Sequence, residues 1–413
     1  MRYRNFCISW IVCFCLLSCE QSENVPRVFG DEISLSEKEL VINRTGNQFS
    51  FDLFRQLSTL DSTDNLFVSP FSISCALGMV NNGASGITYQ EIAQVMLIPD
   101  SVVSSLNNYH QKLIDGLPCL DSTVTVRVAN SMWFNKEVSV KKQFTKKNSV
   151  AYKATFQQLD FSQLESIDKI NGWVSQQTEG CIPEIIYSLS PNQLMVLVNC
   201  LYFQGEWEFP FEESETRKEQ FFCADKTKEN VDMMHQIAAF LYRKNDYFEM
   251  ATFPYGNGSY AMTVLLPRAN KSWKECIDVL GGKNWETWMA DSIEKTLLDV
   301  KLPKLVLKNE YKMNRVLSAM GMPNAFTTNA DFSNLTDVKP VWIGKVVHAS
   351  FLELNERETK ASAVTGLTVT FESEPIPIEP AIPFYANRPF LLIIHETGNH
   401  TILFIGKVSH PNQ

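Results

Sequence analysis

Leu194-Met-Val-Leu-Val-Asn-Cys-Leu-Tyr-Phe203 is an apolar run interrupted only by the amide of Asn199 and the hydroxyl end of Tyr202. A continuous apolar run is typical of a strand that is buried on both faces of its sheet, whereas a half-exposed strand alternates. The stretch therefore predicts the central strand of a large sheet.

The sequence around this strand mixes helical and strand patterns in no regular alternation. Apolar residues at helical spacing predict helices at 47–57, from Ser69-Pro70 onward, and at 89–97, 167–176 and 312–320. Apolar runs bounded by turn residues predict strands at 124–129, 261–266, 298–302, 346–354, 390–394 and 401–408. Because no repeat divides the chain into halves, we expect one α+β domain around a large sheet.

Composition and charge narrow the classes of partner. The 413 residues are 45% hydrophobic and 20% charged, as in an ordinary globular protein with an ample core. The formal net charge of −9 leaves no basic surplus to neutralise phosphates. We therefore expect a protein or a small molecule as the partner, and no nucleic acid.

The N-terminus has the pattern of a bacterial lipoprotein signal. Arg2 and Arg4 precede an apolar run, 6–17, that is too short to span a membrane. Leu16-Leu-Ser-Cys19 resembles a lipobox, so we expect a signal peptide at 1–18, lipidation of Cys19 and a tether at 19–37. The protein would then be exported and lipid-anchored to the outer membrane or cell surface. A plain signal peptide, with a periplasmic or secreted product, is the alternative.

The cysteines do not predict a metal site or a disulfide framework. Four lie in the signal peptide or the lipobox, namely Cys7, Cys13, Cys15 and Cys19, and the other six are Cys75, Cys119, Cys181, Cys200, Cys223 and Cys276. Their irregular spacing lacks the paired short intervals of a metal site. We expect mostly buried thiols, although export would permit some disulfides.

Motifs for catalysis are missing. His395 and His400 are five positions apart, and Gly398-Asn399 between them is typical of a hairpin turn. The glycines of 256–261 lead into a strand, where a dinucleotide site would need a helix. With neither a nucleophile elbow nor a phosphate loop, we expect no enzymatic activity, no metal and no cofactor.

Residues 355–383 contain a segment that is suited to two conformations. Its second half, 374–383, holds four prolines and cannot be a central strand. In its first half the odd positions from Thr359 to Phe371 are small or apolar and uncharged, the period of a strand inside a sheet. A segment that can be loop or strand is a candidate two-state element.

Motifs along nearly the whole mature chain resemble the serpin family of serine protease inhibitors. They are Asn65–Ser74, Asn82–Thr88, Asn199–Phe211, Val231–Gln236, His348–Glu356, Phe384–Phe390 and Ile402–Pro411. The resemblance runs from about residue 38 to residue 411. It implies one serpin domain at 38–413, with about nine helices, three β-sheets and an exposed reactive-centre loop at about 356–383.

The resemblance also implies a mechanism and its residues. A protease cleaves the loop and forms an acyl-enzyme, and the loop then inserts into the main sheet and traps the protease. The implied hinge residues are Glu356, Glu358, Thr359, Lys360, Ala361, Ser362, Ala363 and Val364. The implied reactive bond is Glu372–Ser373, with Phe371–Glu372 and Thr370–Phe371 as alternatives. These bonds suit glutamyl-endopeptidase-, chymotrypsin- and elastase-like serine proteases; cysteine proteases are a further possible target class.

Residues elsewhere match the parts of the family that control insertion. Ser69, Ser72, Asn199 and His348 match the polar shutter beneath the opening sheet, and Trp207 matches the breach where insertion begins. In the hinge, Glu358 replaces the glycine and Lys360 replaces the glutamate that are usual in the family. Loss of the glycine stiffens the hinge. A non-inhibitory binding serpin therefore remains one alternative, and a lipoprotein hydrolase is another. We expect a monomer.

Overall fold

The computed structural model describes residues 32–60, 65–289, 295–357 and 380–412. Cys19, the predicted tether as far as residue 31, and the predicted reactive bond therefore lie outside the described residues. The described part contains nine α-helices and two hydrogen-bonded sheets. The cores of the predicted helices and strands are confirmed, most with longer bounds.

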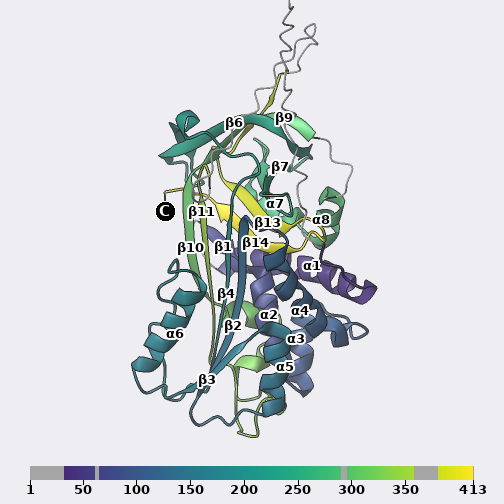
Figure 1. The fold of residues 1–413 in the computed structure, drawn as a ribbon, viewed down its shortest axis with the longest axis vertical. Helices are drawn as coiled ribbons and strands as arrows, with labels where there is room; N and C mark the ends of the chain where they lie inside the picture. Colours follow the sequence, from purple (N-terminus) through teal and green to yellow (C-terminus); the bar gives the residue numbers. More distant parts are fainter. Residues whose placement is uncertain (1–31, 61–64, 290–294, 358–379, 413) are drawn as a thin grey trace, which may run out of the picture.

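A five-stranded sheet runs along the length of the molecule and reaches its lower end at β3 (Figure 1). Its strands, in spatial order, are β10 (Leu305–Lys312), β11 (Lys345–Leu354), β4 (Met195–Gly205), β2 (Val124–Asn135) and β3 (Thr155–Leu159). β4, the strand predicted from the opening stretch, occupies the centre. Lys312 was expected to begin a helix, but it closes β10 by pairing with Val347.

Both faces of β4 are buried, as its sequence predicts. Val196 and Val198 pack into a cluster with α6 (Glu165–Gln177), whereas Leu197 and Leu201 belong to the larger core on the opposite side. Figure 1 shows α6 on one side of the sheet and α2–α5 on the other. Alternate side chains of one strand thus join two different cores.

A nine-stranded sheet lies at the other end of the molecule. Its order is β1 (Leu66–Val68), β14 (Ile402–Val408), β13 (Phe390–Glu396), β8 (Tyr260–Pro267), β7 (Phe248–Tyr255), β6 (Lys228–Lys244), β9 (Lys295–Pro303) and β12 (Ile382–Tyr385), with β5 (Arg217–Phe222) beside β6. β6 is 17 residues long and pairs with β5, β7 and β9 along its length. The resemblance to serpins implies three sheets. Because β6 pairs with strands on both sides, the strands of two of those sheets form one sheet here, and the described residues contain two sheets.

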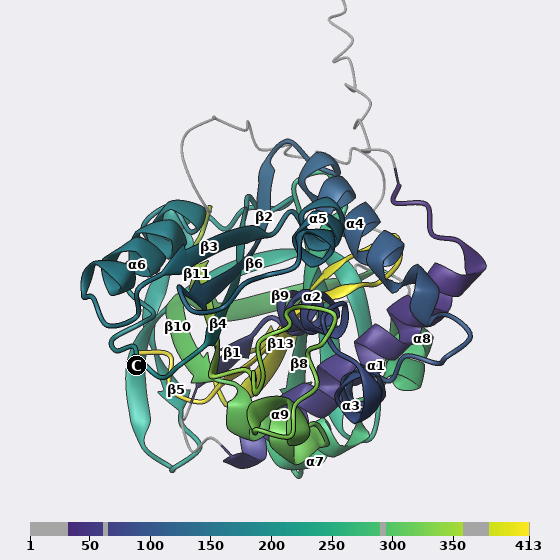
Figure 2. The same ribbon diagram turned by 90° about the horizontal axis from the view of Figure 1, so that it is seen from below.

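The helices form the remaining layers, which Figure 2 shows from below. They are α1 (Glu37–Leu60), α2 (Pro70–Asn81), α3 (Gly86–Val95), α4 (Leu106–Gly116), α5 (Lys142–Tyr152), α6, α7 (Trp273–Val279), α8 (Gly282–Met289) and α9 (Asn314–Met320), with short 3-10 turns at Val103–Ser105, Leu117–Cys119, Glu213–Glu215 and Asn324–Phe326. Ser69 caps α2 by accepting from the Ser72 N–H at 3.2 Å, and Pro70 follows at the first helical position. No helix in these ranges has the length and apolar content needed to cross a bilayer.

Turns and cysteines agree with the sequence-based predictions. Gly256 and Gly258 lie in the β7–β8 hairpin, and Gly398-Asn399 lies in the β13–β14 hairpin. All six cysteines within the described ranges are free. Cys75, Cys200, Cys223 and Cys276 are buried, Cys181 is half-buried and Cys119 is exposed. Mostly buried thiols were expected.

The centre of the nine-stranded sheet should dominate its stability. Leu265 on β8 is fully buried, whereas Leu297 on β9 is 39% exposed. We expect Leu265→Ala to cost about 2–5 kcal/mol because it leaves a cavity, and Leu297→Ala to cost less than about 1 kcal/mol. Denaturant midpoints of both variants test this. Equal losses would contradict the packing described here.

Candidate functional site

The central strands β4 and β11 are joined along only part of their length. They run parallel, and their ladder extends from the Val196–Lys345 pair to the Cys200–Ala349 pair. Both strands continue beyond it, β4 to Gly205 and β11 to Leu354. Within the described residues, the facing edges above Cys200 and Ala349 are therefore not joined to each other. Such edges can accept hydrogen bonds from an added strand.

A buried polar cluster lies where this ladder ends. Asn199 and His348 are register partners next to its last pair. The Ser69 N–H donates to Nε2 of His348 at 3.0 Å, and the Ser72 hydroxyl donates to Oδ1 of Asn199. All four residues of the predicted shutter are buried and are brought together here.

One member of this cluster, Asn130 on β2, belongs to none of the motifs found in the sequence. Nδ2 of Asn199 donates to Oδ1 of Asn130 at 2.5 Å, and Asn130 in turn donates to the Tyr152 carbonyl at 3.0 Å. The cluster thus links β11, β4 and β2 to α2 and α5. Only the strand register, which places Asn130 opposite Asn199, reveals this residue.

The cluster is held by neutral hydrogen bonds. Burial lowers the pKa of His348 to about 3, so the ring is uncharged near neutral pH. Its Nε2 can then act as the acceptor for the Ser69 N–H. Separating β4 from β11 would require these buried groups to exchange partners, because leaving one unpaired costs about 1–3 kcal/mol.

Trp207, the predicted breach residue, lies at the upper end of β4. Its ring stacks on Tyr255 with centroids 4.4 Å apart, and its indole N–H donates to the Asn355 carbonyl at 2.9 Å. The Phe211 N–H donates to the Glu356 carbonyl at 3.0 Å. These bonds attach the end of β11 to the segment that follows β4. They lie directly before residue 357, where this described range ends.

Glu356 is the only predicted hinge residue within the described ranges, and its side chain is buried. Its carboxylate pairs with Nζ of Lys304 at 2.8 Å and accepts from the Thr216 hydroxyl at 2.8 Å. Burial alone raises the pKa of this carboxyl, but the bonds from Lys304 and Thr216 outweigh burial and leave the pKa below its usual value. No motif pointed to Lys304 or Thr216.

The remaining predicted hinge and reactive-bond residues fall in 358–379, outside the described residues. They are Glu358, Thr359, Lys360, Ala361, Ser362, Ala363, Val364, Thr370, Phe371, Glu372 and Ser373. The segments that flank this gap are defined. Arg357 follows the end of β11, and β12 begins at Ile382 on the edge of the nine-stranded sheet, parallel to β9.

The Glu356–Lys304 contact should contribute measurably to the stability of the native state. We expect Glu356→Gln to lower the free energy of unfolding by about 1–3 kcal/mol, because a charged hydrogen bond to a buried carboxylate is lost. Glu213→Gln is the matched control, since the Glu213–Arg357 pair is exposed on both sides and should contribute less than about 1 kcal/mol. Urea unfolding of both variants measures these losses. If Glu356→Gln has the same free energy of unfolding as the unchanged protein, the Glu356–Lys304 contact does not stabilise the native state.

The same contact predicts a dependence on pH. Because the folded-state pKa of Glu356 is lowered, its contribution is present above the unfolded-state pKa of about 4.3 and is lost as pH falls through the folded value. The stability difference between the protein and Glu356→Gln should therefore be constant above about pH 5 and should shrink as the pH falls further below the unfolded-state pKa. Buried His110, His348 and His395, each with a pKa near 3, destabilise both proteins alike on acidification. A difference that is constant with pH would contradict this prediction.

Comparisons with known proteins agree with this arrangement. The family model described as Serpin (serine protease inhibitor) matches residues 44–411. A serpin-like protein of Thermococcus kodakarensis is 31% identical over 94% of this chain and 89% of its own length. The leukocyte elastase inhibitor of Sus scrofa is 29% identical over 90% of this chain and 99% of its own length.

Solved structures show the same fold. The thermophilic serpin tengpin in its native state superposes with a TM-score of 0.82 at 28% identity, covering 91% of this chain and 95% of that one. Human thyroxine-binding globulin superposes with a TM-score of 0.83 at 26% identity, covering 91% and 100%. The sheet built around β4, the cluster at its junction with β11 and the match over residues 44–411 together establish that this chain belongs to the serpin family.

Proposed function

We propose that this protein is an irreversible suicide-substrate inhibitor of serine endopeptidases, with cysteine endopeptidases as a second target class. The observation that carries the proposal is the partly joined edge between β4 and β11. In the sequence, the segment with a strand's alternation starts at Thr359, five residues after the end of β11. Family membership supports a protease as the partner, and the name of the pig relative specifies leukocyte elastase for that protein.

The chemistry divides between protease and inhibitor. The protease serine attacks a loop carbonyl, at Glu372 or a neighbour, and an acyl ester forms while the peptide bond to the next nitrogen breaks. The new amino terminus stays with β12. The acylated portion stays attached to β11 through Glu356 and is then free to enter between β4 and β11.

Insertion would increase the number of backbone hydrogen bonds in the sheet. It breaks the single β4–β11 ladder but forms two ladders, one on each side of the new strand. At about 0.5–1.5 kcal/mol for each hydrogen bond, the gain for about 13 inserted residues is on the order of 10 kcal/mol. At about 3.3 Å per residue, the ester-linked protease would move by about 40 Å.

The shutter and the breach are proposed to control this step. The ladder below Ala349 cannot separate until the bonds among Ser69, Ser72, Asn199 and His348 rearrange. Trp207 and Glu356 lie where the first inserted residue, Thr359 in this proposal, would enter. We also propose lipidation at Cys19, which would hold the inhibitor at the bacterial outer membrane or cell surface.

A non-inhibitory binding role is the second candidate, and Glu358 favours it. A glutamate in place of glycine restricts the backbone of the hinge and slows insertion. A slow hinge would allow the protease to complete hydrolysis, and the loop would then act only as a substrate.

Mixing the full chain with elastase-, chymotrypsin-, trypsin- and glutamate-specific proteases tests the proposal. We expect a band at the summed mass on a denaturing gel with at least one protease, and mass spectrometry of the released peptide should place the cleavage within 370–373. Cleavage without such a band, and with protease activity intact, would establish the non-inhibitory alternative.

Two loop variants separate insertion from recognition. Thr359→Arg puts a charge at an odd, inward position of the inserted strand and should abolish the complex while the loop is still cleaved. Ser362→Arg puts the same charge at an even, outward position and should preserve trapping. Trapping by both variants would exclude insertion as the mechanism.

A further inference from the structure

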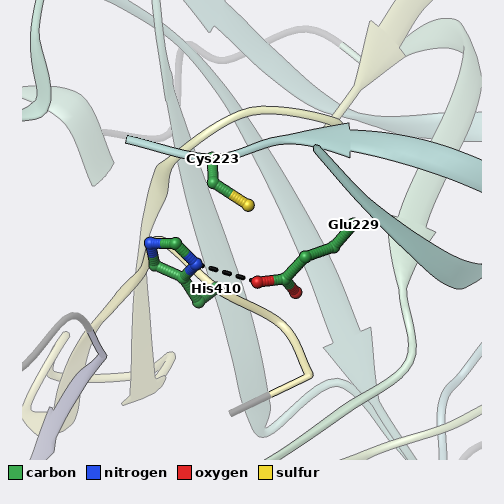
Figure 3. A group of neighbouring side chains, drawn as sticks. All are labelled: Cys223, Glu229 and His410. Carbon is green, nitrogen blue, oxygen red and sulfur yellow. Dashed lines mark hydrogen bonds and ion pairs between the residues drawn. The ribbon is translucent and has the colours of Figure 1, made fainter. Parts of the chain in front are cut away.

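A thiol, an imidazole and a carboxylate from three separate segments face one another where β5 and β6 of the nine-stranded sheet are connected (Figure 3). Cys223 follows β5, Glu229 lies at the start of β6 and His410 follows β14. The sulfur, one ring nitrogen and one carboxylate oxygen all lie within 4.8 Å of one another. No metal site was expected from the sequence because the cysteine spacing is irregular, and His410 lies far from Cys223 and Glu229 along the chain.

The backbone holds these side chains in place from both sides. In the β5–β6 hairpin, the Cys223 N–H donates to the Thr227 carbonyl at 2.9 Å and the Lys226 N–H donates to the Cys223 carbonyl at 3.1 Å. On the C-terminal side, Oδ1 of Asn65 accepts from the His410 N–H at 3.0 Å, and Nδ2 of Asn65 donates to the His410 carbonyl at 2.6 Å. Little rearrangement of the backbone is therefore needed for the side chains to share a ligand.

The donor set identifies the class of ligand. Thiolate, imidazole and carboxylate together are typical zinc ligands, whereas calcium and magnesium prefer oxygen alone. Nδ1 of His410 lies 2.8 Å from Oε1 of Glu229 in a hydrogen bond, so a cation would replace the proton between these two atoms. On the other side of the ring, Oδ1 of Asp225 lies 3.9 Å from Nε2, which is within ion-pair range but too long for a hydrogen bond, so this side chain would have to move closer to accept from the ring N–H. A carboxylate behind a ligating imidazole is the usual way to orient the ring.

The alternative use of a cysteine, a histidine and an acid is a nucleophilic triad, and the environment of the thiol opposes it. Burial raises the pKa of Cys223, a hydrogen bond with Thr227 lowers it in part, and the Glu229 carboxylate raises it again. The nucleophilic form is the thiolate, which this site disfavours.

We propose that Cys223, Glu229 and His410 bind one divalent cation of the zinc class, with Asp225 orienting the imidazole and a fourth position open to water. The cation would join the β5–β6 hairpin to the C-terminal segment. Pro411 and Asn412 of that segment line a cleft of about 380 Å³ together with Lys304 and Leu354. Because Lys304 holds Glu356, the cation would brace the region at the top of β11.

The test uses the full chain, stripped with chelator and titrated with Zn²⁺ by calorimetry and with Co²⁺ by absorbance. We expect one Zn²⁺ per chain, a rise in melting temperature on adding Zn²⁺, and a thiolate-to-cobalt charge-transfer band. Cys223→Ser should remove that band and lower the affinity for Zn²⁺ by at least 100-fold. Asp225→Asn should lower it by about 10- to 100-fold, the range expected when an orienting carboxylate is lost.

Matched controls use similar groups outside the cluster. Cys119→Ser changes an exposed thiol, and His235→Asn breaks another histidine–carboxylate pair, in which His235 on β6 lies 2.9 Å from Asp299 on β9. Both variants should leave the affinity for Zn²⁺ unchanged. Asp225→Asn changes an exposed side chain and should therefore fold. It tests whether the cluster binds Zn²⁺ if Cys223→Ser does not fold. No uptake of Zn²⁺, or uptake unaffected by Cys223→Ser or by Asp225→Asn, would overturn the proposal.

Discussion

The rest of the structure depends on the incomplete ladder between β4 and β11. β4 pairs with β2 along its whole length, from Met195 to Gly205, whereas its ladder with β11 ends at Cys200 and Ala349. At that end, His348 on β11 accepts from the Ser69 N–H and Asn199 on β4 accepts from the Ser72 hydroxyl, so both strands are bonded to the start of α2. The fold therefore combines a fully packed core with one edge that is prepared to accept another strand.

The contacts at the top of this edge belong to one connected region. Trp207 and Phe211 hold the end of β11 through Asn355 and Glu356, and Lys304 and Thr216 hold the Glu356 carboxylate. The C-terminal segment lies against the same region and meets the β5–β6 hairpin at Cys223 and Glu229. Segments that are far apart in sequence thus converge where insertion is proposed to begin.

The sequence was most informative where one property dominates over many residues. The apolar run 194–203 predicted a central strand, and the turn glycines at 256–258 and 398 predicted the hairpins that the structure contains. The four shutter residues were found through motifs of the family rather than from burial. Asn130, Lys304 and Thr216 were missed because each lies in a stretch whose local pattern is ordinary, and each acquires its role from a partner in another segment.

By itself, the sequence determined the hydrophobic pattern, the central strand, the hinge alternation and the resemblance to serpins, because all of these are carried by neighbouring residues along the chain. Only the tertiary structure decided where the β4–β11 ladder ends and that Lys304 is the residue that pairs with Glu356. It also brought Cys223, Glu229 and His410 together at one site. The physical reason is distance along the chain. Register, ion pairing and ligand convergence are set by how strands pack against one another, and no local pattern records that.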